Sequence, residues 1–114
     1  MRKIVIVVAK MRDCFFDLIR SGAKRYEVRD EPFEGAQAIL YVRPEDGKEL
    51  GLYRIKDVFK LPRSEDARLV RLSGISEDEF YELFPSVADE GPAELWVARI
   101  GEPINLECLL EETK

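Results

Sequence analysis

Apolar positions divide the chain into segments whose spacing predicts strands and helices. Residues 4–9 form a continuous and mostly β-branched run, which is typical of a strand buried on both faces. Residues 13–21 follow a 3.6-residue period, which predicts a helix capped by Asp13 and ended by Gly22 in the left-handed conformation. Residues 25–29 alternate between charged and apolar side chains, which predicts a strand with one apolar face.

The middle of the chain predicts a hairpin. Residues 38–42 are apolar and β-rich, and the turn at 44–47 contains Pro and Asp-Gly. Residues 49–61 then predict one long, bent strand. Within it, Gly51 permits a bulge or the close approach of another backbone.

The last third of the chain mixes extended and helical signals. Residues 68–72 are expected to be extended. Ser76 and Glu79 have the spacing of a capping box, which predicts a short helix that ends before Pro85. Residues 93–100 predict the closing strand.

These elements amount to five or six strands and two helices in 114 residues. Connections are too short for repeated βαβ units, so the expected class is α+β, with a small mixed or antiparallel barrel plugged by helices. One domain is expected over residues 1–114, with a core at about 4–106 and a partly ordered acidic tail.

Composition removes several functional classes. The chain has no histidine, which excludes Ser-His-Asp catalysis, and it lacks the Cys/His cage of a zinc deaminase. Cys14 and Cys108 are expected to be reduced, apolar packing groups. With no targeting or membrane segment in the sequence, the expected location is cytoplasmic, with no metal, cofactor or membrane partner.

Charge is unevenly distributed along the chain. The net charge of −5 argues against broad, nonspecific attraction to nucleic acid. Residues 1–30, however, hold eight basic and four acidic side chains, whereas the remaining 84 residues hold 10 basic and 19 acidic ones. An anion site would therefore draw on the first thirty residues, and chance clustering on a solvated face is the alternative.

The most informative segment is Gly-x-Lys-x-x-Glu-x-Arg over residues 22–29. Strand geometry places Glu27 and Arg29 on one face, about 7 Å apart, near Lys24 at the strand entry. The two cations could hold a phosphate or carboxylate while Glu27 accepts hydrogen bonds from a base or a water. The alternative is a surface ladder in which Glu27 pairs with Arg25 and Arg29, and those cations are expected to lower the pKa of Glu27.

This motif, with the helix before it and the strands after it, resembles the signature of the ASCH family. The likeness extends over roughly residues 4–106 and includes 51–58, 72–83 and 95–100. It implies a PUA-like β-barrel with a cleft lined by Lys24, Glu27 and Arg29.

The resemblance implies that the cleft handles RNA, a nucleotide or a nucleoside. Binding of such a ligand is the first hypothesis, and a hydrolase of modified nucleosides or a ribonuclease, with Lys24, Glu27 and Arg29 as the catalytic residues, is the second. A regulatory protein-interaction module is the third. Compared with the amidohydrolases of the family, Glu27 stands where a hydroxyl residue is expected, and Ser73-Gly74 lies where a carboxylate is expected.

Further candidate ligand contacts carry simpler alternatives. Lys10 and Arg12 could rim the cleft or occupy a solvated turn. Ser73 and Gly74 could present backbone N–H groups to a phosphate, although the acidic residues after them favour plain capping. Trp96 could stack on a base, but a lone Trp in an apolar strand is more often a core residue.

Overall fold

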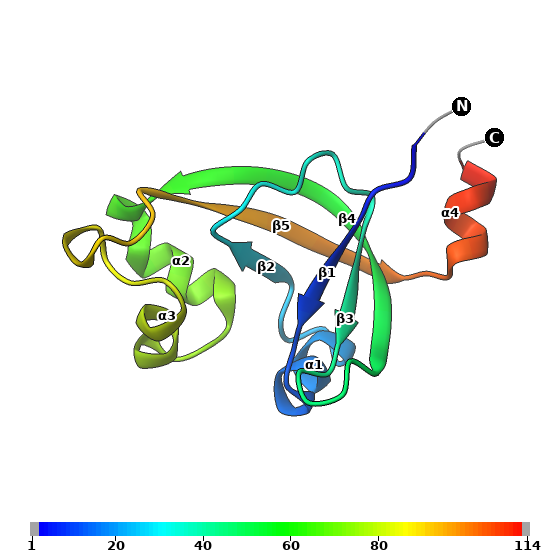
Figure 1. Ribbon diagram of the computed structural model, residues 1–114, viewed down its shortest axis with the longest axis horizontal. Coiled ribbons are helices and arrows are strands. Elements are labelled where there is room, and N and C mark those ends of the chain that lie inside the picture. Colours follow the sequence, from blue (N-terminus) through cyan, green and yellow to red (C-terminus); the bar gives the residue numbers. More distant parts are fainter. Residues whose placement is uncertain (1–2, 113–114) are drawn as a thin grey trace.

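The computed structural model describes residues 3–112, which form a mixed five-stranded sheet with helices around it (Figure 1). The strands are β1 (Ile6–Lys10), β2 (Tyr26–Arg29), β3 (Ala38–Val42), β4 (Glu49–Pro62) and β5 (Glu94–Pro103). Their spatial order is β1-β3-β4-β5-β2, with β1 and β3 parallel and all other neighbours antiparallel. The predicted α+β class with a small mixed sheet is confirmed.

β1 and β2 are the two edges of the sheet, so the strands form half a barrel and leave it open. The expectation that β1 is buried on both faces is wrong. Val5, Val7 and Ala9 pack against the core, whereas the Val8 side chain points away from it and is 58% exposed. An apolar run does not distinguish an edge strand with one covered face from a central strand.

The predicted hairpin and the predicted long strand are both confirmed. β3 pairs with the first half of β4, and the second half of β4 pairs with β5 to form a long ribbon. The register shifts next to Tyr53 and Ile55, which bends the ribbon. A Cβ at Gly51 would lie 2.9 Å from Cζ of Phe16, so the glycine allows this aromatic ring to approach the sheet.

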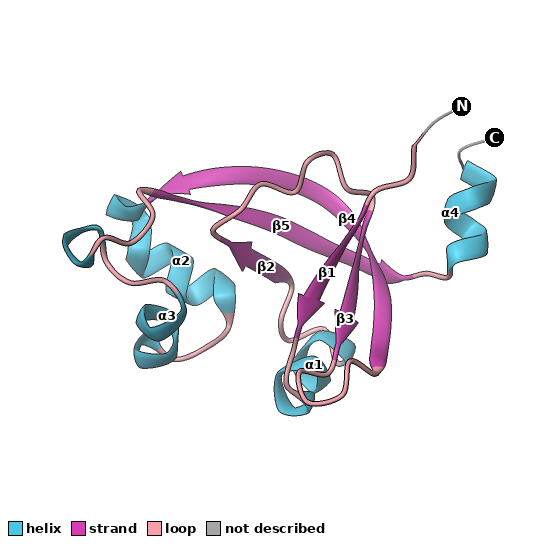
Figure 2. Ribbon diagram, in the orientation of Figure 1, coloured by secondary structure: helices cyan, strands magenta, loops and turns pink. Residues whose placement is uncertain are grey.

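Four α-helices are found in the described residues, where the sequence predicted two. They are α1 (Asp13–Arg20), α2 (Asp66–Ser73), α3 (Glu77–Leu83) and α4 (Leu106–Glu112). Two 3₁₀ turns, η1 (Arg63–Glu65) and η2 (Val87–Asp89), complete the set. Figure 2 shows α2 and α3 at one end of the β4–β5 ribbon and α4 at the other.

The two predicted helices are present, with one corrected cap. Gly22 follows α1 with a φ of +83°, as expected. The N-cap of α1 is Arg12, and Asp13 lies inside the first turn, where its charge still favours the helix N-terminus. Ser76 caps α3 by accepting a hydrogen bond from the backbone N–H of Glu79.

α2 and α4 are corrections to the sequence analysis. Residues 68–72 are helical and not extended, because Leu69 is fully buried and Gly74 ends α2 with a φ of +73°. The acidic tail forms α4 around the buried Leu109.

Two other expectations concern single side chains. Cys14 and Cys108 are exposed and do not pack in the core, whereas Trp96 does pack against it.

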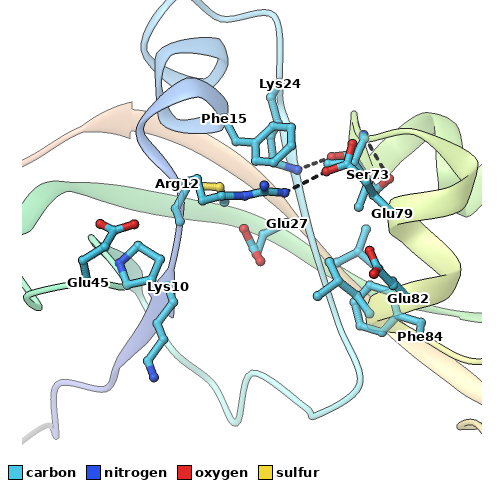
Figure 3. Close-up of a pocket in the computed structure, with 15 residues that line it drawn as sticks. Lys10, Arg12, Phe15, Lys24, Glu27, Glu45, Ser73, Glu79, Glu82 and Phe84 are labelled. Atoms are coloured by element: carbon cyan, nitrogen blue, oxygen red, sulfur yellow. Dashed lines mark hydrogen bonds and ion pairs between the residues drawn. The ribbon is translucent and has the colours of Figure 1, made fainter.

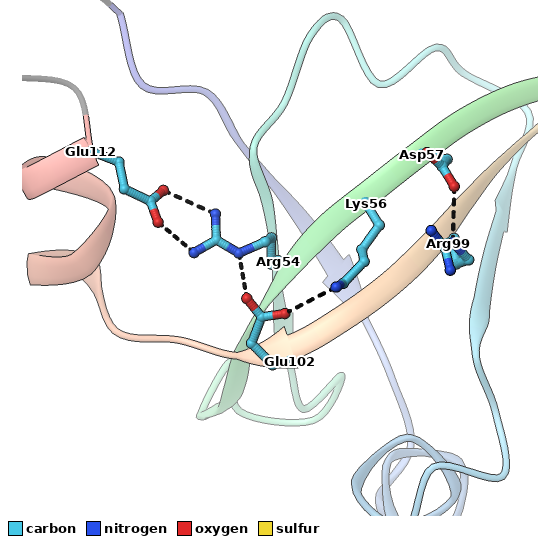
Figure 4. Close-up of polar contacts among 6 residues, drawn as sticks. All are labelled: Arg54, Lys56, Asp57, Arg99, Glu102 and Glu112. Atoms are coloured by element: carbon cyan, nitrogen blue, oxygen red, sulfur yellow. Dashed lines mark hydrogen bonds and ion pairs between the residues drawn. The ribbon is translucent and has the colours of Figure 1, made fainter.

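α4 is held to the sheet by a charge network centred on Arg54 (Figure 4). The Arg54 guanidinium makes two hydrogen bonds to the Glu112 carboxylate, at 2.6 and 2.9 Å, and a third to Glu102. This bidentate pairing lowers the pKa of Glu112, and its geometry is the favourable one for an arginine and a carboxylate.

We expect Arg54→Met to loosen α4 while the sheet stays intact. The variant removes all three hydrogen bonds, and the burial of Leu109 would have to hold the seven-residue helix without them. Hydrogen exchange of the α4 amides should accelerate, and 1 M salt should produce part of the same effect in the wild type. The matched control is Arg99→Met, which breaks the exposed pair with Asp57 on the same ribbon. Unchanged α4 exchange in Arg54→Met would contradict this role.

Candidate functional site

A cavity of about 400 Å³ lies where the end of β1 and the start of α1 meet β2, α2 and α3 (Figure 3). Its lining is mostly apolar, with two largely buried charged residues, Lys24 and Glu27, among the lining residues. The apolar lining includes Met11, Phe15, Val28, Ile75, Leu83 and Phe84. This volume and this mixture of apolar walls with a few polar groups are typical of small-molecule sites.

Lys24 enters the site because α1 ends at Arg20, four residues before it. The backbone N–H of Lys24 donates to the carbonyl of Leu18, which fixes the chain as it leaves the helix. The side chain is 7% exposed, and its ammonium donates to the carbonyls of Tyr26, at 2.8 Å, and Ser73. Burial lowers the pKa of Lys24, and the nearby Glu27 charge partly opposes this.

Glu27 lies on β2, and its side chain reaches into the cavity. Its Oε1 accepts a 3.0 Å hydrogen bond from the hydroxyl of the buried Tyr41. Burial raises the pKa of Glu27, and this effect exceeds the opposing influence of Lys24, Tyr41 and Arg29. The expectation of a lowered pKa is therefore wrong, because flanking cations identify neighbours along the chain but not the loss of water around the carboxylate.

Lys24 and Glu27 interact without touching. Each changes the pKa of the other, yet no nitrogen–oxygen pair between them lies within 4.0 Å. Within the described residues, Oε2 of Glu27 accepts no hydrogen bond, and Figure 3 shows the carboxylate pointing into the cavity. The site therefore presents a fixed cation and an accessible carboxylate oxygen with space between them.

Arg29 is not part of this cavity, which corrects the expected cleft. Its guanidinium lies 3.3 Å from a Glu31 oxygen and over the Phe33 ring at 5.7 Å. It lines a second hollow of about 390 Å³ between β1 and the loop after β2. Arg29 is two residues beyond Glu27, a step of about 7 Å, and this carries it past the cavity to the loop that provides its partner.

Three of the remaining candidates line the cavity and two do not. Lys10, Arg12 and Ser73 are lining residues. Arg25 is exposed and donates to the carbonyl of Gly22. Gly74 is not a lining residue, and it supports the site from outside the cavity because it lies next to the Lys24 side chain. Ser73 contributes its carbonyl to Lys24, a role different from the phosphate contact considered for its N–H.

Charges at the cavity rim are mixed and mostly acidic. Arg12 pairs with Glu79 at 2.7 Å, linking the start of α1 to α3 across the cavity (Figure 3). Glu45 and Glu82 also line the cavity, and the described residues offer neither of them an ion pair or a side-chain hydrogen bond. Among the described residues that line the cavity, Lys10 is the other rim cation.

Sequence reasoning missed Tyr41, Phe15 and the rim carboxylates. Tyr41 lies in an apolar strand, where a buried hydroxyl needs a hydrogen-bond partner, and this was the available signal. Phe15 falls within the helix predicted over residues 13–21, and Glu79 falls within the predicted capping box. No local pattern indicates that these residues meet Lys24, which is distant in sequence from Tyr41 and Glu79.

Comparison with solved structures identifies the architecture. The ASCH protein from Zymomonas mobilis superposes with a TM-score of 0.66 over 94% of this chain and 78% of that chain, at 22% identity. A serine-to-alanine variant of that protein gives a TM-score of 0.67 at 21% identity, over 97% and 81% of the two chains. The chain has an ASCH-like fold.

A more distant neighbour of this ASCH-like chain is described as hypothetical protein PH0355. It has a TM-score of 0.57 and 18% identity, over 87% of this chain and 99% of that chain. No protein-family model and no curated protein matches the chain. The likeness to the ASCH family inferred from residues 22–29 is thus confirmed for the fold.

The described part of the ASCH-like chain lacks two features. Residues 3–112 contain no helix long and apolar enough to cross a membrane. They also contain no cluster of three or more Cys, Asp or Glu residues arranged to hold a metal ion. The cytoplasmic location stays a prediction.

We expect Glu27→Gln to stabilise the protein increasingly as pH rises. The folded-state pKa of Glu27 lies above its unfolded value, so the wild type is relatively most stable below the unfolded pKa and loses stability as pH rises through the folded pKa. Glutamine cannot ionise and keeps an acceptor for Tyr41. The melting temperature of the variant should exceed that of the wild type by several degrees near neutral pH, at about 4 °C per kcal/mol.

The control for this experiment is Glu45→Gln, which neutralises an exposed rim carboxylate without changing the buried pair. Its melting temperature should follow that of the wild type across the pH range. A difference between Glu27→Gln and the wild type that does not depend on pH would contradict the raised pKa.

Proposed function

We propose that this ASCH-like protein binds a nucleoside-type ligand, with the base enclosed in the cavity. The observation that supports this most strongly is the pair of buried charged groups, Lys24 and Glu27, beside apolar walls in a cavity of about 400 Å³ whose rim carries the other charges. Apolar walls suit the faces of a flat ring, and the two polar groups suit its hydrogen-bonding edge. Phe15 supplies an aromatic wall on which a ring could stack.

The rim charges favour a nucleoside over an extended RNA. A strand of RNA needs a groove of unpaired cations along its phosphates. Here Arg12 is paired with Glu79, Lys24 is enclosed by backbone carbonyls, and Glu45 and Glu82 add negative charge at the opening. RNA binding stays a prediction of the family resemblance, and we expect RNA to bind more weakly than a nucleoside.

The test is a binding panel of nucleosides, their 5′-monophosphates and short RNAs, read by thermal shift and calorimetry. A nucleoside present at 100 times its dissociation constant should stabilise the protein by about 2.7 kcal/mol. Lys24→Met should weaken that binding about 10- to 100-fold, because it removes a charged donor from an enclosed site. Lys60→Met is the matched control, since Lys60 lies over the Trp96 ring outside the cavity.

Two results would contradict the proposal. One is tighter binding of RNA than of every nucleoside, and the other is equal loss of affinity in Lys24→Met and Lys60→Met.

A second candidate function is hydrolysis of a modified nucleoside, and the raised pKa of Glu27 favours it. A carboxylate whose pKa is raised above its ordinary value is a better proton acceptor than an ordinary glutamate. Glu27 would take a proton from water as the water oxygen attacks an amide carbonyl. The C–N bond would then break, and the same proton would pass to the departing amine.

Incubation of the protein with N-acetylcytidine tests this second function. Cytidine release, followed by chromatography, should fall about 10²- to 10⁴-fold in Glu27→Gln if Glu27 is the general base. The stability control Glu45→Gln should keep full turnover. If the wild type binds nucleosides tightly but does not turn over N-acetylcytidine, the binding function stands and N-acetylcytidine is excluded as a substrate.

A further inference from the structure

We propose that Lys24 and Glu27 together select a ring that carries a lactam, meaning a ring carbonyl next to a ring N–H. The carbonyl oxygen accepts from the Lys24 ammonium, and the adjacent N–H donates to Oε2 of Glu27. This inference rests on the proposed nucleoside function and names the class of base that the cavity takes.

The Lys24 ammonium has one direction left for a ligand. It carries three N–H donors, and two of them go to the backbone carbonyls of Tyr26 and Ser73. Those carbonyls belong to β2 and to the end of α2, so they hold the nitrogen from two sides of the fold. The third donor is the one that a ligand acceptor in the cavity can use.

Only one of the two oxygens of the Glu27 carboxylate accepts a hydrogen bond within the described residues. Tyr41 donates to Oε1, and Oε2 accepts no hydrogen bond within the described residues, so Oε2 is the oxygen left for a ligand. When Glu27 is ionised, Oε2 only accepts. A ligand atom opposite it must therefore be a donor, and a ring nitrogen without hydrogen would face an unpaired carboxylate oxygen.

The gap between the two groups leaves room for ligand atoms that contact both. Lys24 and Glu27 are near enough to influence one another electrostatically, but they are farther apart than the 4.0 Å of an ion pair. A carbonyl oxygen and the adjacent N–H fill such a gap with one hydrogen bond to each side. The ligand's carbonyl and N–H are both uncharged. This suits the cavity opening, where Glu45 and Glu82 would repel an anion.

The apolar walls favour a lactam that belongs to a flat ring. Phe15 and Val28 line the cavity from the α1 and β2 side, and Ile75 and Phe84 line it from the α3 side. A ring between these walls removes apolar surface from water while its edge meets the polar pair. Loss of one of the two edge hydrogen bonds leaves a buried group unpaired, which typically costs about a factor of ten or more in affinity.

The experiment compares uridine with two methylated forms by calorimetry. 3-Methyluridine lacks the ring N–H, whereas 5-methyluridine keeps it and adds the same bulk elsewhere on the ring. We expect 3-methyluridine to bind at least about tenfold more weakly than uridine and 5-methyluridine to bind within a few-fold of it. Guanosine and 1-methylguanosine provide an independent pair with the same expected loss.

A pH series separates recognition by Glu27 from a simple steric effect of the methyl group. Uridine affinity should fall as pH is lowered through the pKa of Glu27, which burial places above the ordinary range. Tyr41→Phe removes a hydrogen bond that favours the ionised form, so the fall should begin at higher pH. Tyr53→Phe is the matched control, because its ring packs against Tyr41 and its hydroxyl does not contact Glu27.

The outcomes distinguish this inference from the proposed function. If nucleosides bind but uridine and 3-methyluridine bind equally, the lactam inference is overturned and the nucleoside function stands. A pH profile that is identical in the wild type and Tyr41→Phe likewise overturns the role of Glu27. If no nucleoside or methylated analogue binds, the proposed function fails, and this inference fails with it.

Discussion

The burial of the Lys24 ammonium is the interaction on which the candidate site depends. An ammonium group removed from water is costly unless its donors are satisfied. Here the carbonyls of Tyr26 and Ser73 satisfy two of them, so the start of β2 is tied to the end of α2. This tie fixes one wall of the cavity, and Gly74 ends α2 next to the Lys24 side chain with a φ of +73°, a conformation that favours glycine.

The open half-barrel explains why a cavity forms at this place. A closed barrel would pair β1 with β2, but here both strands are edges. The end of β1 and the middle of β2 are therefore free to line a common space, which α2 and α3 close from the side. Arg63 stabilises that closure, because its buried guanidinium binds Asp66 in α2 and the carbonyls of Phe84 and Pro85 after α3.

The sequence predicts the parts of this fold that depend on local periodicity. β3, β4, α1 and the capped α3 follow from spacing, turn residues and the Ser76 cap. α2 and α4 do not, because each is a short, charged helix whose formation depends on burying one leucine against the rest of the fold, Leu69 and Leu109. The site shows the same division. The motif over residues 22–29 and the resemblance that it carries singled out Lys24 and Glu27, whereas the Tyr41 contact and the raised pKa of Glu27 depend on tertiary packing.

Fold stability alone does not account for the Lys24–Glu27 pair. Two charges taken out of water are seldom more stabilising than apolar side chains of similar volume, and here they do not even form a direct ion pair. The contribution of Glu27 to stability is smaller still, because its Oε2 has no hydrogen-bond partner among the described residues. A ligand that bridges the gap would satisfy both groups at once, so the pair costs stability in the free protein and contributes affinity in the bound one.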